Sequence, residues 1–156
     1  MTFVRPDRQP DWADTIGGPL IDPGMTAKEA FLHALGAWPA WLRAALVVRN
    51  MVVAPFGLKT ELEGDGHLLT RMPVVTEKPE HYETGIADRH LSFTIAVHVQ
   101  NASVYMTTAI WYNNWLGRVY LRVVMPGHIL AVRHAAGRVA HPISRRSGEF
   151  NESVIL

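Results

Sequence analysis

The chain lacks the residues and spacings on which several kinds of site are built. Its 156 residues include no cysteine, which excludes disulfide bonds and metal sites made of thiolates. The eight histidines show no H-x-H or H-E-x-x-H spacing, and no G-x-S-x-G sequence is present to place a nucleophilic serine. We therefore expect neither a bound metal ion nor a cofactor.

Charged residues and long apolar runs are also scarce. Charged residues make up 19% of the chain and the formal net charge is +1, whereas nucleic-acid binding needs a concentrated basic surface. No apolar run reaches about 18 residues, the length typical of a membrane-spanning helix, and the longest is interrupted by Arg43 and Arg49. The first residues lack the basic start and apolar run of a signal peptide. These absences predict a cytoplasmic protein that neither binds nucleic acid nor inserts into a membrane.

The length and the apolar content predict one domain. Hydrophobic residues make up 48% of the chain, which suits a single core that buries about two thirds of the unfolded surface. Residues 1–10 are largely polar and are expected to form a flexible arm, while 141–156 are expected to form a mobile tail. The domain itself is predicted to span 11–140.

Two helices are predicted near the N-terminus. Thr26 is a good N-cap, and Glu29 follows it by three residues in the capping-box pattern, with Gly36 as the stop signal. Pro39 suits the first turn of a second helix over 39–54, where apolar residues recur at intervals of about three and four. Both helices precede the part of the chain in which the period changes to two.

Period-two alternation predicts an antiparallel sheet. Its clearest strand is 90–100, where Leu91 and Phe93 alternate with polar residues, so one face is expected to be buried against a helix. Short gaps between the strands suit hairpins, and Asn101-Ala102 is the tightest turn. The predicted strands are 12–16, which Gly17-Gly18-Pro19 ends, 67–76, 80–86, 90–100 and 103–112.

A long helix is predicted to end the domain. Apolar residues return at helical spacing over 115–140, and Asn113 or Asn114 is placed to cap the N-terminus of this helix. At about 1.5 Å per residue such a helix crosses a whole small domain, so we expect it to pack on the sheet. Pro126 predicts a kink, next to which His128 would stand at the rim of a pocket.

Three stretches of the chain resemble one family. They are W-L-R-A-A-L-V-V-R-N-M-V-V-A-P-F-G-L at 41–58, E-T-G-I-A-D-R-H-L-S-F at 83–93 and N-N-W-L-G-R-V-Y-L-R-V-V-M-P-G-H at 113–128. They are similar to the family known as domain of unknown function 2867, most specifically in Asp88-Arg89-His90-Leu91 and Leu116-Gly117-Arg118. The resemblance implies an α+β helix-grip fold, as in START and polyketide-cyclase-like proteins. In that fold an antiparallel sheet wraps round the long C-terminal helix and a cavity lies between them. It implies no particular reaction.

The turn before residue 90 holds the first candidate site. Asp88 could orient His90 as a general base or contact a ligand, or it could serve only to cap the turn. His90 shares a strand face with Ser92 and not with Leu91, so a His90 that faces the helix would require a bulge.

Two residues of the long helix are further candidates. Arg118 stands in its first turn, where a cation opposes the helix dipole, so we expect it to pair with Glu83 or Asp88 or to bind an anionic group of a ligand. His128 could take part in acid–base chemistry beside the kink, or it could simply face solvent.

Three hypotheses of function remain open. The leading one is a domain that binds a small apolar molecule between the sheet and the long helix. Its candidate ligand contacts are Glu83, Asp88, His90, Arg118, Tyr120 and His128. The second is a small cofactor-independent enzyme of the cyclase, isomerase or hydratase type, with His90 or His128 acting beside Asp88. The third is a structural module that forms a homodimer through exposed rings near Trp115.

Overall fold

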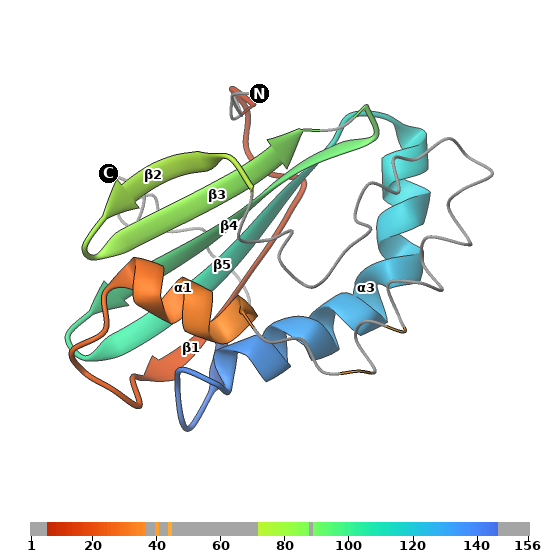
Figure 1. Ribbon diagram of the computed structural model, residues 1–156. Helices are drawn as coiled ribbons and strands as arrows, with labels where there is room; N and C mark the ends of the chain where they lie inside the picture. Colours follow the sequence, from red (N-terminus) through yellow and green to blue (C-terminus); the bar gives the residue numbers. More distant parts are fainter. Residues whose placement is uncertain (1–5, 37–39, 41–43, 45–71, 88, 147–156) are drawn as a thin grey trace.

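The computed structural model describes residues 6–36, 40, 44, 72–87 and 89–146. Its strands form one six-stranded sheet in the order β2-β3-β4-β5-β1-β6, in which every neighbouring pair is antiparallel. The strands are β1 (Trp12–Pro19), β2 (Val74–Lys78), β3 (His81–Ala87), β4 (Leu91–Gln100), β5 (Ser103–Tyr112) and β6 (Ser144–Arg146). Helices α1 (Ala27–Leu35) and α3 (Trp115–Ala136) lie on the same side of this sheet (Figure 1), which we call the helix side. The predicted α+β class with an antiparallel sheet is confirmed.

Strands β2 to β5 form the predicted meander. The turn between β4 and β5 is Asn101-Ala102, and both residues have positive φ, 51° and 56°, as a two-residue hairpin turn requires. β2 begins at Val74 rather than at the predicted residue 67, and residues 67–71 of that prediction lie outside the described part. The short gaps between these four strands therefore predicted their order in the sheet correctly.

Strand β4 buries residues on both of its sides. Val97 and its apolar neighbours at period two face the helix side, as predicted. Ser92 and Thr94, on the opposite or far side, are also buried, at 4% and 3% exposure. The Oγ of Ser92 accepts a hydrogen bond of 3.1 Å from the Nδ2 of Asn113. The expectation of one buried face is therefore wrong for this part of the strand.

Strand β1 is longer than predicted because its glycines do not end it. Gly17 pairs with Tyr105 of β5, and a Cβ at Gly17 would overlap the carbonyl oxygen of Val104. The glycine thus permits a close backbone approach within the sheet. Pro19 is the last residue of β1, where a missing N–H costs the ladder least.

Helix α1 begins as its sequence predicts. The side-chain oxygen of Thr26 accepts from the N–H of Glu29, and the Glu29 carboxylate accepts from the N–H of Thr26 at 2.8 Å, so the capping box is complete. Gly36 is the C-cap. Of the second predicted helix, 39–54, the structure describes Ala40 and Ala44, both helical, and the rest lies outside the described residues.

Helix α3 confirms the long C-terminal helix but ends four residues early. Asn114 is the N-cap, its side chain accepting from the N–H of Gly117 at 3.1 Å. The helix ends at Ala136 instead of residue 140, with Gly137 as its C-cap, and Ala140 forms a bridge to Leu20. Figure 1 shows α3 bending part-way along, and Pro126 lies inside it. Within the described residues, no helix has the length and hydropathy that crossing a membrane requires.

The chain on either side of the predicted domain contacts the sheet. Ser144–Arg146, within the stretch predicted as a tail, form β6 and pair with β1. Arg8, within the stretch predicted as an arm, donates to the carbonyl oxygen of Tyr112 at 2.8 Å, and its own carbonyl accepts from the Nε1 of Trp111. The described structure thus extends beyond 11–140 at both ends.

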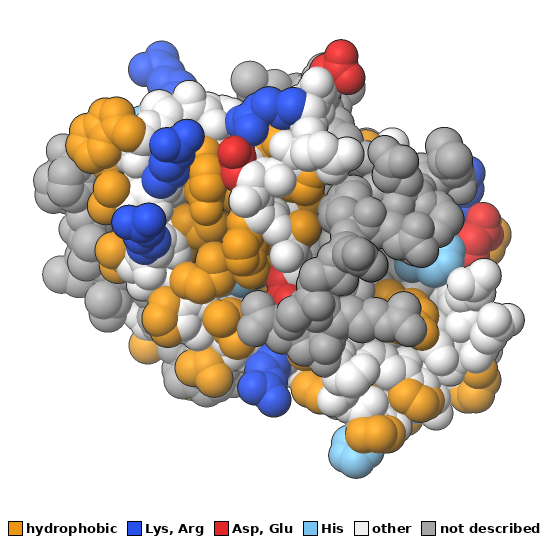
Figure 2. All heavy atoms as spheres, turned by 180° about the vertical axis from the view of Figure 1, so that it is seen from behind, with side chains coloured by type: hydrophobic (Ala, Val, Ile, Leu, Met, Phe, Trp, Pro, Cys, Tyr) orange, Lys and Arg blue, Asp and Glu red, His pale blue; other side chains and the backbone are white. Residues whose placement is uncertain are grey.

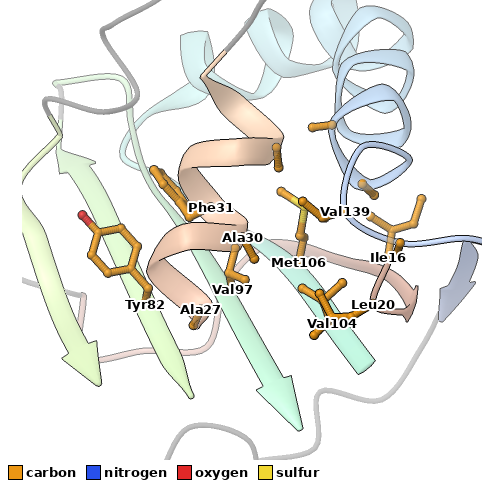
Figure 3. Packing of buried hydrophobic residues seen from close by; sticks show 14 residues of the cluster. Ile16, Leu20, Ala27, Ala30, Phe31, Tyr82, Val97, Val104, Met106 and Val139 are labelled. Atoms are coloured by element: carbon orange, nitrogen blue, oxygen red, sulfur yellow. The ribbon is translucent and has the colours of Figure 1, made fainter. Parts of the chain in front are cut away.

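The packed core occupies one half of the helix side. Phe31 of α1 is fully buried, and its ring meets that of Tyr82 edge-on with centroids 5.0 Å apart (Figure 3). Val97 and Met106 lie beneath it on β4 and β5, and Val139, just beyond α3, closes one edge. Burying a ring such as that of Phe31 contributes about 1.5–3 kcal/mol. This core fixes α1 and the C-terminal end of α3 on the sheet.

Candidate functional site

The two stretches that most specifically resemble the suspected family meet at one junction. A Cβ at Gly117, in the first turn of α3, would overlap the carbonyl oxygen of His90. That carbonyl also accepts a hydrogen bond of 2.9 Å from the N–H of Asn113. Glycine is favoured where two backbones approach this closely. These residues therefore join the start of α3 to the turn that precedes β4.

The side chain of Asn114 holds His90 within this junction. Since its Oδ1 accepts from Gly117, its Nδ2 must be the donating group, and it donates to the carbonyl of Arg89 at 3.1 Å. The same Nδ2 lies 3.1 Å from the Nδ1 of His90, a distance at which Nδ1 can accept a hydrogen bond from it. Asp88, the expected partner of His90, lies outside the described residues.

Arg118 lies beside this junction and on the opposite side of the sheet from Glu83. Its guanidinium is 6.0 Å from the centroid of the Tyr112 ring. Burial acts to raise the pKa of Asp11, but the N–H of Tyr112, the side chain of Arg8 and the charge of Arg118 together hold it below its usual value. The expected pairing with Glu83 does not form, because strand alternation turns Glu83 to the far side.

Glu83 belongs to a cluster with two histidines on the far side. His81 and His98 face each other on β3 and β4 with ring centroids 5.9 Å apart, and the Nε2 of His81 is 3.7 Å from the Oε2 of Glu83. Burial, followed by the neighbouring His81, lowers the pKa of His98. The Nδ1 of each histidine is buried without a hydrogen-bond partner among the described residues. No three His, Asp or Glu side chains in the described ranges are arranged to hold a metal ion.

The side chain of His128 projects from α3 toward the helix side of β1. Its ring meets the ring of Trp12 edge-on at a centroid distance of 5.5 Å. Burial lowers the pKa of His128, while the negative charge of Asp14 acts in the opposite direction. Burial thus favours the neutral imidazole, in which one nitrogen carries a proton and the other can accept a hydrogen bond. Its Nε2 is buried and has no hydrogen-bond partner among the described residues.

The helix side of the sheet, from β1 beside α3 across to β3, carries apolar side chains that are incompletely covered. In register, Trp12 lies beside Ile110, Ile110 beside Phe93 and Phe93 beside Ile86, so four strands contribute to one row on the helix side. Leu91 continues this surface at the end of β4. We call these five residues the apolar floor. Ile110 is buried, and the other four remain partly exposed although they lie on the side that the helices cover.

The middle of α3, which packs beside β1 and β5, is less buried than its two ends. Its buried residues are Gly117 and Leu121 near one end and Ala135 and Ala136 at the other. From 122 to 134 every residue is partly or fully exposed, including those on the turns that face the sheet. Close packing would bury the inward positions of such a helix. Among the described residues, the middle of α3 is thus less buried than either of its ends.

A separate hollow lies at the start of α1. Its volume is about 580 Å³, and its lining residues are Asp22, Gly24, Met25, Glu29, Leu32 and His33. All but Met25 are exposed, and the Glu29 carboxylate is already engaged in the capping box. This hollow is therefore a surface depression with no free buried polar group, and we place the candidate site at His128 instead.

The predicted site residues do not converge. His90 contacts Asn114, the N-cap of α3, whereas His128 lies fourteen residues further along the chain, beyond Pro126. Tyr120 is partly buried on α3 about two turns before His128. Glu83 is on the far side of the sheet. Of the candidates, His128 is the one whose described surroundings combine an apolar floor with an unpartnered buried polar atom.

The sequence patterns did not lead us to two neighbours of His128. Trp12 and Asp14 share the helix side of β1 with Ile16, which period two could have indicated. Nothing in the sequence indicated that this side would meet the second half of α3 rather than α1.

These features define a class: an α+β protein whose antiparallel sheet has the described helices α1 and α3 on one side, with a polar side chain, His128, near apolar residues of the sheet. The chain belongs to the family described as protein of unknown function (DUF2867), whose model matches residues 8–135. No curated protein and no solved structure is similar enough to match the chain. The matched region contains the junction of His90 with Gly117 as well as His128.

Proposed function

We propose that this protein is a binding domain of the helix-grip type that holds a small, mainly apolar molecule between the apolar floor and the middle of α3. The observation that carries the proposal is the Nε2 of His128, which is buried and has no partner among the described residues. Leaving such an atom unsatisfied costs about 1–3 kcal/mol. A hydroxyl or carbonyl group on the ligand would remove that cost.

The surroundings of His128 favour an apolar ligand with one polar group. Trp12 offers the edge of a large ring 5.5 Å from the imidazole, and Phe93 and Ile86 extend the surface along the same row. Binding sites for small molecules are commonly apolar, with a few polar groups that set the orientation. His128 would supply this orientation, and Asp14 would favour a ligand group that donates a hydrogen bond or carries a partial positive charge.

A second candidate function is acid–base catalysis at the same place. A partly buried imidazole whose neutral form is favoured, near a carboxylate, can accept and donate a proton, as a cyclase, isomerase or hydratase without a cofactor would require. Here the carboxylate is that of Asp14, in place of the expected Asp88. This candidate requires the same bound molecule, so binding is the first property to establish.

Binding can be tested with the neutral apolar fluorophore N-phenyl-1-naphthylamine. We expect the wild-type protein to enhance its fluorescence saturably, and His128→Phe, which fills space and removes the polar group, to reduce the affinity at least about ten-fold. The matched control is His134→Phe on the exposed side of the same helix, which should bind as the wild type does. Equal titrations for both variants, or none for the wild type, would show that the site is not under α3.

A further inference from the structure

The outer side of α3 carries a strip of exposed apolar side chains. Trp115 is 72% exposed, Val119 49%, Val123 66% and Leu130 59%. At about 100° per residue these four positions fall within one sector of the helix, so they form a continuous line opposite the side that faces the sheet. We call them the outer strip. An apolar line of this kind on a surface helix indicates contact with something outside the described chain.

Cations border the outer strip, and the helix has no anion. Arg118, Arg122 and Arg133 are exposed, and the sequence of α3 contains no aspartate or glutamate. Neither Arg122 nor Arg133 forms an ion pair with a described residue. Along the edge of the molecule where α3 lies, Figure 2 shows Lys or Arg side chains beside apolar ones. The occupant of this surface must therefore offer both apolar contact and negative charge.

A second copy of α3 does not meet this requirement. Two such helices packed strip to strip would bring Arg122 of each copy toward the same contact, and neither helix has a carboxylate to neutralise it. Like charges brought together at an interface oppose association. Charge complementarity therefore disfavours the homodimer that exposed rings near Trp115 suggested.

We infer that α3 lies along the surface of an anionic lipid bilayer, with the outer strip entering the headgroup region and its arginines contacting lipid phosphates. Helices that bind in this way combine an apolar line, flanking Arg or Lys and an aromatic residue that prefers the interface, which here is Trp115. The contact is peripheral. It uses the side of α3 opposite His128 and does not depend on the proposed ligand site.

The test is co-sedimentation of the full chain with vesicles at low ionic strength. We expect binding to phosphatidylcholine vesicles that contain about 30% phosphatidylserine and little binding to phosphatidylcholine alone. Val123→Asp should weaken binding at least about ten-fold, since it removes apolar contact and adds a negative charge. Arg122→Gln should weaken it about five-fold.

The matched control is Val74→Asp, which places the same charge at another exposed valine, on β2 at the opposite edge of the sheet. It should bind vesicles as the wild type does. Equal binding to both kinds of vesicle, or equal binding by Val123→Asp and Val74→Asp, would overturn the inference. So would a dimer in sedimentation velocity that Val123→Asp dissociates, because the outer strip would then be an interface between copies of this chain.

Discussion

Replacing Gly117 by alanine is expected to lower the free energy of unfolding by about 2–3 kcal/mol, although alanine is the better helix former. The added Cβ would overlap the carbonyl oxygen of His90, which already accepts a hydrogen bond from Asn113. Both sides of this contact are backbone, so no side-chain rotation can relieve it. Either the first turn of α3 or the turn before β4 must move. Urea unfolding of the variant measures the loss.

Gly127 provides the matched control for this substitution. It lies in the same helix, and a Cβ there would have no heavy atom within 4 Å among those considered. Gly127→Ala should therefore stabilise the protein by about 1 kcal/mol through helix propensity alone. If the two alanine variants changed stability by the same amount and sign, the close junction between α3 and the turn before β4 would be wrong.

Phe31→Ala is expected to have the largest effect of any core substitution in α1, a loss of about 3–5 kcal/mol. Phe31 is fully buried and packs edge-on against Tyr82, between α1 and the sheet in Figure 3. Its removal leaves a cavity between α1 and the sheet that the backbone of neither element can close. Since domains of this size are stable by about 5–15 kcal/mol, the unfolding midpoint should fall markedly.

Leu32, the next residue along α1, is the control for Phe31→Ala. Its side chain is 42% exposed, so Leu32→Ala should change the free energy of unfolding by no more than about 0.5 kcal/mol. Circular dichroism during thermal unfolding compares the two variants. Similar losses for both would mean that α1 does not present this side to the sheet.

Local signals in the sequence were sufficient for much of the fold. The capping box of Thr26 and Glu29 predicted the start of α1, because the two residues form hydrogen bonds with each other. Asn101-Ala102 predicted a hairpin, because two residues suffice for its turn. The clear alternation in β4 assigned Val97 to the helix side correctly. Such signals depend on contacts within a few residues, which a sequence displays directly.

Features that depend on distant contacts were not predicted. β1 continues through Gly17 because the glycine lies against Val104, and Ala140, predicted as part of the long helix, instead forms a bridge to Leu20. β6 exists because β1 has a free edge for Ser144–Arg146 to join. Each of these contacts joins segments that are far apart in the chain, so the local pattern of apolar and polar residues does not predict them.

The candidate site was predicted in part, for the same reason. Pro126 directed attention to His128, because a proline inside a helix is visible in the sequence, and the structure has Pro126 inside α3. Glu83 and His90 were grouped with it, but strand alternation turns Glu83 to the far side and the cap of α3 engages His90. Asp14 was overlooked because its approach to His128 is set by the packing of α3 on β1.

The most direct test of a ligand beneath α3 is native mass spectrometry of the intact protein after incubation with a lipid and small-molecule extract of its expression host. The account predicts a discrete added mass on the wild-type protein that disappears on denaturation and is absent or much weaker with His128→Phe. It would be contradicted by a bare protein in every sample, or by the same added mass on the wild type and on His128→Phe.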